Sequence, residues 1–164
     1  MSTTPKTSEC VASVPLPVKR ILVPVDFSEC SIFALRYAAN LAQQVEASII
    51  LAHVVTSLIS PPEMEYVQLD SKKFWAEVEK LANAKLTALA QKEIPATVHA
   101  SPIVRRGAAW EEITTLAKQR KADLIIIGSH GYTGLKHMIM GSTAEKVVRY
   151  AGCPVLVVRE YGKA

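Results

Sequence analysis

The residues best suited to binding a phosphate are concentrated in one segment, GSHGYTGLKHMIMGST at 128–143, which holds four of the chain's seven glycines. The segment follows the apolar run ADLIII and precedes AEKVV. A buried strand is therefore expected to end at Gly128, and a helix to begin just after Gly141. Glycine lets the backbone approach a ligand closely, and free N–H groups at a helix start attract anions. The pattern predicts either a phosphate-binding loop or a glycine-rich crossover without a ligand.

The glycines follow a fixed spacing: Gly128, two residues, Gly131, nine residues, and then Gly141-Ser142. This differs from the Walker loop and from the dinucleotide fingerprint. Ser142 has two interpretations that can coexist. Ser142-Thr143-Ala144-Glu145 matches the capping box, in which Ser142 caps the helix and the glutamate reaches back to it. The hydroxyl can also turn to a bound phosphate. Gly134 lies outside the spacing and is assigned to a turn.

Length and composition predict one globular domain at 19–160 after a flexible tail at 1–18. The net charge of +4 is spread over short clusters, which does not favour nucleic-acid binding. No apolar run is long enough for a membrane span. The three cysteines lack metal-ligand or disulfide spacing. Reduced thiols and a cytoplasmic location are therefore expected.

Strands and helices alternate along the chain. Five apolar, β-branched segments predict strands at 20–26, 47–55, 96–104, 122–128 and 154–158. Helices are expected after an N-cap at Ser28, over 71–93, after Gly107 and over 142–151. This order predicts a parallel sheet with helices on both faces. Ligands of such sheets bind beyond the carboxyl ends of the strands. The connection at 56–70 contains Pro61-Pro62 and receives no role.

The chain resembles the universal stress protein family over about residues 18–160. The resemblance is carried by ILVPVDFSE at 21–29, LAHVV at 51–55, the G-x2-G-x9-G-S pattern, and CPVLVV at 153–158. It implies a Rossmann-like sheet of strand order 3-2-1-4-5. The glycine pattern is the mark of the members that bind ATP, so the resemblance favours the phosphate-binding interpretation.

The resemblance also assigns roles near the first two strands. Asp26 would bond ribose hydroxyls or help to hold Mg²⁺ or Mn²⁺, although by itself it can equally accept from loop N–H groups. Pro24 and Val25 would wall the adenine, with the Val25 backbone reading the base. Val54 would be the adenine's apolar neighbour, and Ile127 would lie beneath the base. Each of these apolar residues could equally belong to the core.

Two histidines lie next to predicted site residues in the sequence. His130 stands where many ATP-binding relatives carry arginine, and a neutral imidazole is a weaker phosphate partner; it can also be an exposed loop residue. His53 lies inside an apolar strand and is expected to be a hydrogen-bonded structural residue. Together the predicted nucleotide site comprises Pro24, Val25, Asp26, Val54, Ile127, Gly128, His130, Gly131, Gly141, Ser142 and Thr143.

The resemblance implies a cytoplasmic ATP- or AMP-binding stress protein that acts in regulation or protection. It further implies a homodimer formed through the C-terminal strand at Val155–Arg159; the alternative is an edge covered by the N-terminal tail. The sequence contains no nucleophile–base arrangement or paired carboxylates, so the protein is not expected to be an enzyme. The alternatives are a dimeric interaction module without a nucleotide, a slow ATPase, and an enzyme acting on an adenylated substrate.

Overall fold

The computed structural model describes residues 18–56, 71–130 and 140–159. Its five strands form one parallel sheet of order β3-β2-β1-β4-β5, which confirms the predicted topology. The strands are β1 Arg20–Pro24, β2 Ser48–Val55, β3 Ala100–Arg106, β4 Leu124–Gly128 and β5 Val155–Val158. The helices are α1 Glu29–Val45, α3 Ser71–Glu93, α4 Ala109–Gln119 and α5 Ser142–Tyr150. None of the helices described is long and apolar enough to span a membrane.

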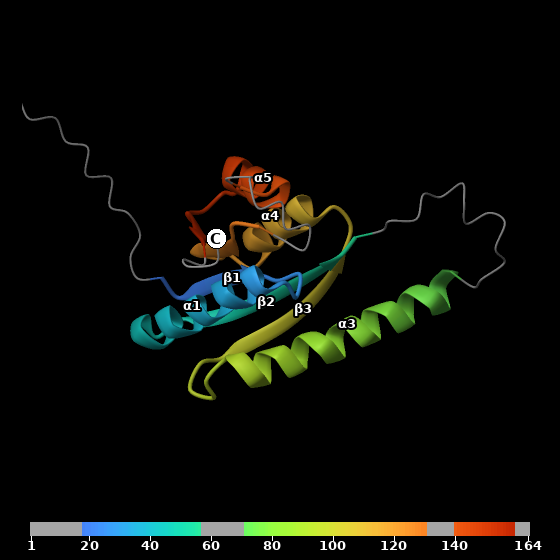
Figure 1. Ribbon diagram of the computed structural model, residues 1–164, viewed down its shortest axis with the longest axis horizontal. Helices are drawn as coiled ribbons and strands as arrows, with labels where there is room; N and C mark the ends of the chain where they lie inside the picture. The colour runs from blue at the N-terminus through green and yellow to red at the C-terminus, as the bar shows by residue number, and fades with distance from the viewer. Residues whose placement is uncertain (1–17, 57–70, 131–139, 160–164) are drawn as a thin grey trace, which may run out of the picture.

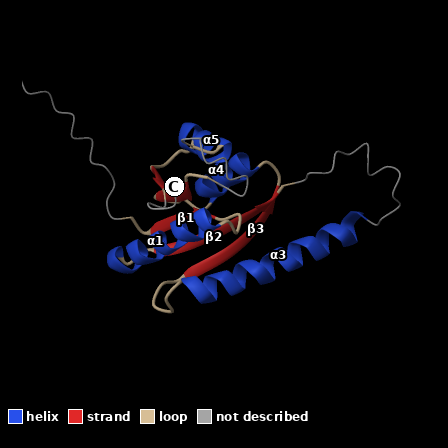
Figure 2. Ribbon diagram, viewed as in Figure 1, coloured by secondary structure: helices blue, strands red, loops and turns tan. Residues whose placement is uncertain are grey.

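Helices cover both faces of the sheet (Figures 1 and 2). The α1 and α3 helices pack on one face, and α4 and α5 on the other. Side chains of β1 alternate between these layers: Ile21 and Val23 face α1 and α3, and Leu22 faces α4 and α5. A strand covered on both sides needs apolar residues at every position. That requirement explains the continuous apolar runs in the sequence.

Several boundaries differ from the sequence prediction, most of all that of the third strand. The third strand begins at Ala100, not at residue 96, because the Val98 N–H donates to the Pro95 carbonyl at 2.9 Å and closes a turn. The leucines of α3 differ in burial, since Leu86 is fully buried and Leu81 is 62% exposed. Residues 1–17 of the predicted tail lie outside the described residues, and Val18 packs against the core under α1.

The two edge strands differ in the backbone groups that they expose. Residues at odd positions of β3 bond to β2, since His99 accepts from Ile49 and Gly107 donates to Val55. Pro102 therefore lies in the outward-facing row of β3, where proline removes an open N–H and blunts the edge. The outward row of β5 contains Val155 and Val157 and keeps its N–H groups, because the even positions bond to β4.

Asp123 joins the starts of β1 and β4. Its Oδ2 accepts hydrogen bonds from the backbone N–H groups of Lys19 (3.0 Å) and Arg20 (2.8 Å), and the Arg20 guanidinium lies 3.6 Å from Oδ1. Burial acts to raise the pKa of the Asp123 carboxyl. The two N–H groups and the guanidinium outweigh burial, and the pKa lies below its ordinary value.

Asp123→Asn is expected to lower the free energy of unfolding by about 1–2 kcal/mol at pH 7. A carboxyl whose pKa is lowered by folding stabilises the fold above its unfolded pKa of about 3.9, and this stabilisation is lost as the pH falls through the folded pKa. Urea titrations at pH 7 and pH 3 should therefore show a smaller difference between variant and parent at pH 3. Glu79→Gln, at an exposed position of α3, is the control. An equal difference at both pH values would contradict the role of the charge.

Candidate functional site

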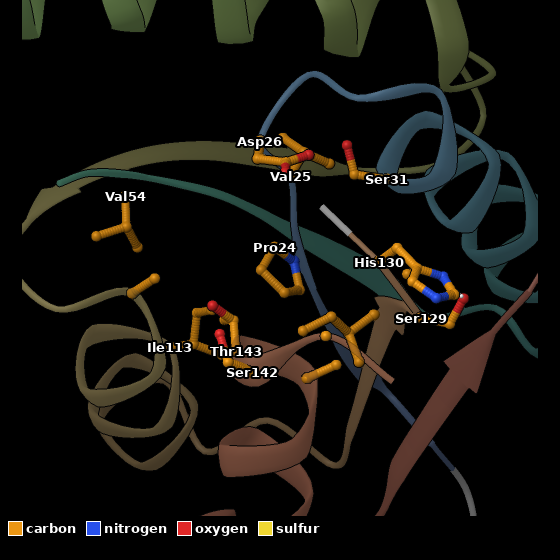
Figure 3. Close-up of a pocket in the computed structure, with 15 residues that line it drawn as sticks. Pro24, Val25, Asp26, Ser31, Val54, Ile113, Ser129, His130, Ser142 and Thr143 are labelled. Atoms are coloured by element: carbon orange, nitrogen blue, oxygen red, sulfur yellow. Dashed lines mark hydrogen bonds between the residues drawn. The ribbon is translucent and has the colours of Figure 1, made fainter. Parts of the chain in front are cut away.

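A pocket lies at the carboxyl ends of β1, β2 and β4 (Figure 3). It is lined by every predicted nucleotide-site residue that the structure describes. Gly131 lies outside the described residues, as does Gly134. Val54 and His130 lie at opposite ends of the pocket in Figure 3. The topology thus brings segments more than 100 positions apart in the sequence into one site.

The start of α5 differs from the predicted capping box. Gly141, in an extended conformation with φ −73° and ψ 151°, is the N-cap and supplies no side-chain bond. Ser142 is the first helical residue, and its side chain bonds to no described residue. Glu145 does not reach back to the cap; its carboxylate accepts from Arg149 at 3.3 Å. The capping-box prediction is therefore wrong, because Gly141 takes the position that the pattern gave to serine.

This start leaves α5 with backbone donors that no described residue uses. The first intrahelical bond runs from the Glu145 N–H to the Gly141 carbonyl. No described residue accepts from the N–H groups of Ser142, Thr143 and Ala144, all of which line the pocket. The α4 helix, whose N-cap Ala108 likewise makes no side-chain bond, reaches the pocket with Ala109. Free N–H groups and the positive end of the helix dipole suit an anion.

Gly128 ends β4 against the first turn of α1. A Cβ added there would lie 3.0 Å from both the carbonyl oxygen and the sulfur of Cys30. Such contacts are shorter than side chains tolerate, and one of the two atoms belongs to the backbone. Close packing against Cys30 therefore requires glycine at position 128, which also lines the pocket.

Gly128→Ala is expected to lower the free energy of unfolding by about 1–3 kcal/mol, since added atoms in a tight contact force the neighbours apart. Gly152→Ala is the matched control, because a Cβ there meets nothing within 4 Å. Thermal unfolding of the two variants measures the difference. Equal stability of the two variants would contradict the prediction and show that the first turn of α1 shifts to accommodate the added methyl group.

Asp26 shapes the loop between β1 and α1. Its Oδ1 accepts from the N–H of Ser28 at 3.0 Å and from the Ser28 hydroxyl. Ser28 in turn caps α1 by accepting from the N–H of Ser31 at 3.2 Å. Phe27 between them has φ 66°, a left-handed conformation that non-glycine residues rarely adopt. The predicted N-cap at Ser28 and the acceptor role of Asp26 are confirmed.

The backbone near Val25 and Val54 defines the other end of the pocket. The Val25 N–H donates to the Ala52 carbonyl at 2.8 Å, and the Val25 carbonyl accepts from Nδ1 of His53 at 2.8 Å. His53 is thus a hydrogen-bonded structural residue, as expected. The Val25 backbone has no spare N–H with which to read a base. Even positions of β2 face β1, and β1 ends at Pro24 opposite Ala52, so the N–H and C=O of Val54 face the open side.

The opposite end of the pocket contains a serine–histidine contact. The Ser129 hydroxyl lies 2.8 Å from Nδ1 of His130, and the side chain of Ser129 is buried. Asp26 is the only carboxylate among the described residues of the pocket. Among the described residues, no group of three or more His, Cys, Asp or Glu side chains could hold a metal ion.

Five residues that line the pocket were not among the predicted site residues: Ser31, Ala109, Ile113, Ser129 and Ala144. Ser129 directly follows a strand end, and Ser31 lies in the first turn of α1. Their positions near the carboxyl edge of the sheet could therefore have identified both residues as candidates for the pocket. Ile113 belongs to the apolar face of α4, where periodicity alone cannot separate core from pocket.

The universal stress protein family model matches residues 17–159 of the chain. Universal stress protein MJ0531 of Methanocaldococcus jannaschii is 34% identical over 149 residues, which make up 87% of this chain and 82% of the relative. Universal stress protein YxiE of Bacillus subtilis is 33% identical over 152 residues, covering 85% of this chain and 98% of the relative. Both similarities extend over almost the whole length of the proteins compared.

Solved structures show the same fold. The hypothetical protein MJ0577 of Methanocaldococcus jannaschii superposes with a TM-score of 0.76 at 29% identity, covering 89% of this chain and 99% of that one. A universal stress protein in complex with cAMP (TM-score 0.60, 21% identity, 87% and 97% covered) and one from Archaeoglobus fulgidus in complex with dAMP (0.57, 20%, 85% and 96%) share the fold. On the family match and these relatives, the chain belongs to the universal stress protein family.

Proposed function

We propose that this protein binds an adenine nucleotide, ATP or AMP, in the pocket at the carboxyl edge of the sheet. The observation that carries the proposal is the start of α5, where three backbone N–H groups and the Ser142 hydroxyl have no described partner and border the pocket. Phosphate is the biological anion that such helix starts commonly bind. Two proteins of the same fold are in complex with the adenine nucleotides cAMP and dAMP.

The open backbone of Val54 supports adenine as the base. Its N–H and C=O form a donor and an acceptor next to each other, beyond the end of β1. Adenine presents an amino donor beside a ring-nitrogen acceptor, which complements this pair. The side chains of Pro24 and Ile127 line the pocket and supply apolar surface for the ring. We therefore assign to the Val54 backbone the base-reading role that the family resemblance implied for the Val25 backbone.

The ribose and any metal ion would lie near Asp26. Its carboxylate lines the pocket and offers the oxygen ligands that ribose hydroxyls and hard cations prefer. A Mg²⁺ or Mn²⁺ ion would neutralise phosphate charge there. The described pocket supplies one carboxylate, so such an ion would take its remaining ligands from the phosphates and water.

We infer a role in regulation or protection, in which the bound nucleotide is retained rather than consumed. The free thiols of Cys30 and Cys153 suit the reducing cytoplasm, where we place the protein. We further propose that two copies pair through β5, whose outward row at Val155 and Val157 keeps its hydrogen-bonding groups. The opposite edge carries Pro102 and is the less suitable one.

Mass spectrometry of ligand released from freshly purified protein tests the proposal, together with calorimetric titration of ATP and AMP. We expect an adenine nucleotide in the released fraction and a dissociation constant in the micromolar range, about −8 kcal/mol. Absence of bound nucleotide together with no heat of binding would favour the alternative of a dimeric module without a nucleotide. Rapid release of phosphate or pyrophosphate would favour an enzyme instead.

A further inference from the structure

We propose that Phe27 is a positioning residue for the nucleotide site: its ring anchors the loop between β1 and α1, so that Asp26 is held at the pocket before a ligand binds. The role of Asp26 toward a ligand rests on the proposed nucleotide-binding function. The anchoring of the loop rests on the contacts that Phe27 makes with β2 and α3.

The backbone of Phe27 adopts a conformation that its residue type disfavours. Its φ of 66° lies in the left-handed region. Glycine adopts this region without steric cost, and asparagine or aspartate adopt it more readily than an aromatic residue does. A bulky residue keeps such a conformation only where the surrounding structure compensates for the strain. The side chain of Phe27 must therefore make contacts that a glycine could not make.

The ring of Phe27 meets two elements that lie outside its loop. It packs against the buried cluster on the α1 and α3 face of the sheet. The ring of His53 in β2 lies 4.6 Å away, measured between ring centroids, and is tilted by 48°. Nζ of Lys85 in α3 lies 4.0 Å from the centroid of the Phe27 ring, a distance at which an ammonium group is attracted to an aromatic face. The ring thus connects the loop to a strand and to a helix.

The His53 ring is a fixed partner for this contact. Its Nδ1 lies 2.8 Å from the Val25 carbonyl oxygen, which can only accept, so Nδ1 donates this bond. The Val25 N–H donates in turn to the carbonyl of Ala52, the neighbour of His53 in β2. The residues on both sides of Asp26 are therefore held against β2, the preceding one by hydrogen bonds and the following one by its ring.

Asp26 lies between these two anchors and lines the pocket. Figure 3 shows it on the loop that leads from β1 into α1. Its Oδ1 accepts from the N–H and the hydroxyl of Ser28, two residues ahead, and such a contact requires the chain to turn at the residue between them. That residue is Phe27. A site whose groups are ordered before binding loses less affinity to ordering them, so the anchor favours ligand binding.

Phe27→Gly removes the ring and leaves the left-handed conformation available without strain. Calorimetric titration with AMP should then show roughly 3- to 10-fold weaker binding, the factor by which the binding-competent fraction of the loop falls when several arrangements compete. Phe27→Tyr keeps the ring and should keep the affinity. Phe33→Ala removes a ring that packs against the same cluster from α1, so it controls for lost packing and should bind AMP like the parent. Unchanged affinity in Phe27→Gly would overturn the proposal.

A double-mutant cycle separates positioning of Asp26 from general damage to the pocket. In an Asp26→Ala background there is no carboxylate to position, so adding Phe27→Gly should weaken AMP binding little further. The two changes are then far from additive. If Phe27→Gly weakens binding by the same factor with and without Asp26, the ring does not act through this carboxylate, and the proposal is wrong.

Backbone amide exchange in the ligand-free protein tests the anchoring by itself. The Ser28 N–H, which donates to Asp26, should exchange faster with solvent in Phe27→Gly, as measured by magnetisation-transfer NMR. It should exchange as in the parent in Phe27→Tyr and Phe33→Ala. An unchanged rate for Ser28 in Phe27→Gly would show that the loop does not need the ring. If the rates change as expected but the parent binds neither AMP nor ATP, the proposed function fails while Phe27 remains the anchor of the loop.

Discussion

Replacing Ser142 with alanine is expected to weaken ATP and AMP binding roughly 10- to 150-fold, because a hydrogen bond to a charged phosphate is worth about 1.5–3 kcal/mol. The hydroxyl lies at the first position of α5, is exposed, and lines the pocket. Titration calorimetry measures the change. The melting temperature should stay the same, since the side chain caps no helix and bonds to no described residue.

The control for this change is Ser48→Ala. Ser48 begins β2 at the amino ends of the strands, away from the pocket. Its hydroxyl donates to the Lys19 carbonyl at 3.1 Å. Its removal should leave nucleotide affinity unchanged. If Ser142→Ala and Ser48→Ala bind AMP equally well, the phosphate does not lie at the start of α5, and the central argument of the proposed function is lost. A fall in melting temperature for Ser142→Ala would instead restore a structural role for the serine.

The sheet could be predicted from the sequence because its strands are covered on both faces. Ile125, Ile126 and Ile127 are all buried, and such a run leaves few alternatives to an internal parallel strand. The start of α1 was also predictable, since Ser28 and Asp26 interact within three positions of sequence. Local patterns are reliable where the partners are neighbours in the chain.

The same reasoning failed at the start of α5, although the pattern there was as clear. Ser142 and Glu145 match a capping box, but the Gly141 N–H bonds to the Ser129 carbonyl, and this contact with the end of β4 places the N-cap one residue earlier. The open backbone edge of Val54, which we propose reads the base, was missed for a related reason. This edge exists only because β1 ends before β2 does. Which of two paired strands extends further depends on how they align, and no single segment of sequence encodes that alignment.

The two edges of the sheet differ in how well they suit pairing with a second copy of the chain. In β3 the outward row includes Pro102, so this edge lacks one of the donors that a second sheet would need. In β5 the outward N–H groups at Val155 and Val157 remain available. Pairing of two copies through β5 in antiparallel fashion would place the two strands across a two-fold axis. Such pairing would extend the sheet without disturbing the bonds between β4 and β5.

Val157→Pro is therefore expected to separate the proposed dimer. The substitution removes an outward N–H, whereas the bonds to β4 are made by Leu156 and Val158 and remain. In a symmetric pair the change acts twice, and the loss of two hydrogen bonds of about 1.5 kcal/mol each raises the dimer dissociation constant roughly 100-fold. Sedimentation velocity at micromolar concentration measures the shift from dimer to monomer.

Val157→Thr is the matched control, because threonine keeps the N–H and the β-branched shape. It should sediment like the parent protein. Circular dichroism should show that the proline variant keeps its fold, as an edge position with an outward N–H tolerates proline. A proline variant that is folded and still dimeric would place the interface on another surface. A parent protein that sediments as a monomer would instead contradict pairing through β5 and leave the proposed nucleotide pocket as the functional centre of a single chain.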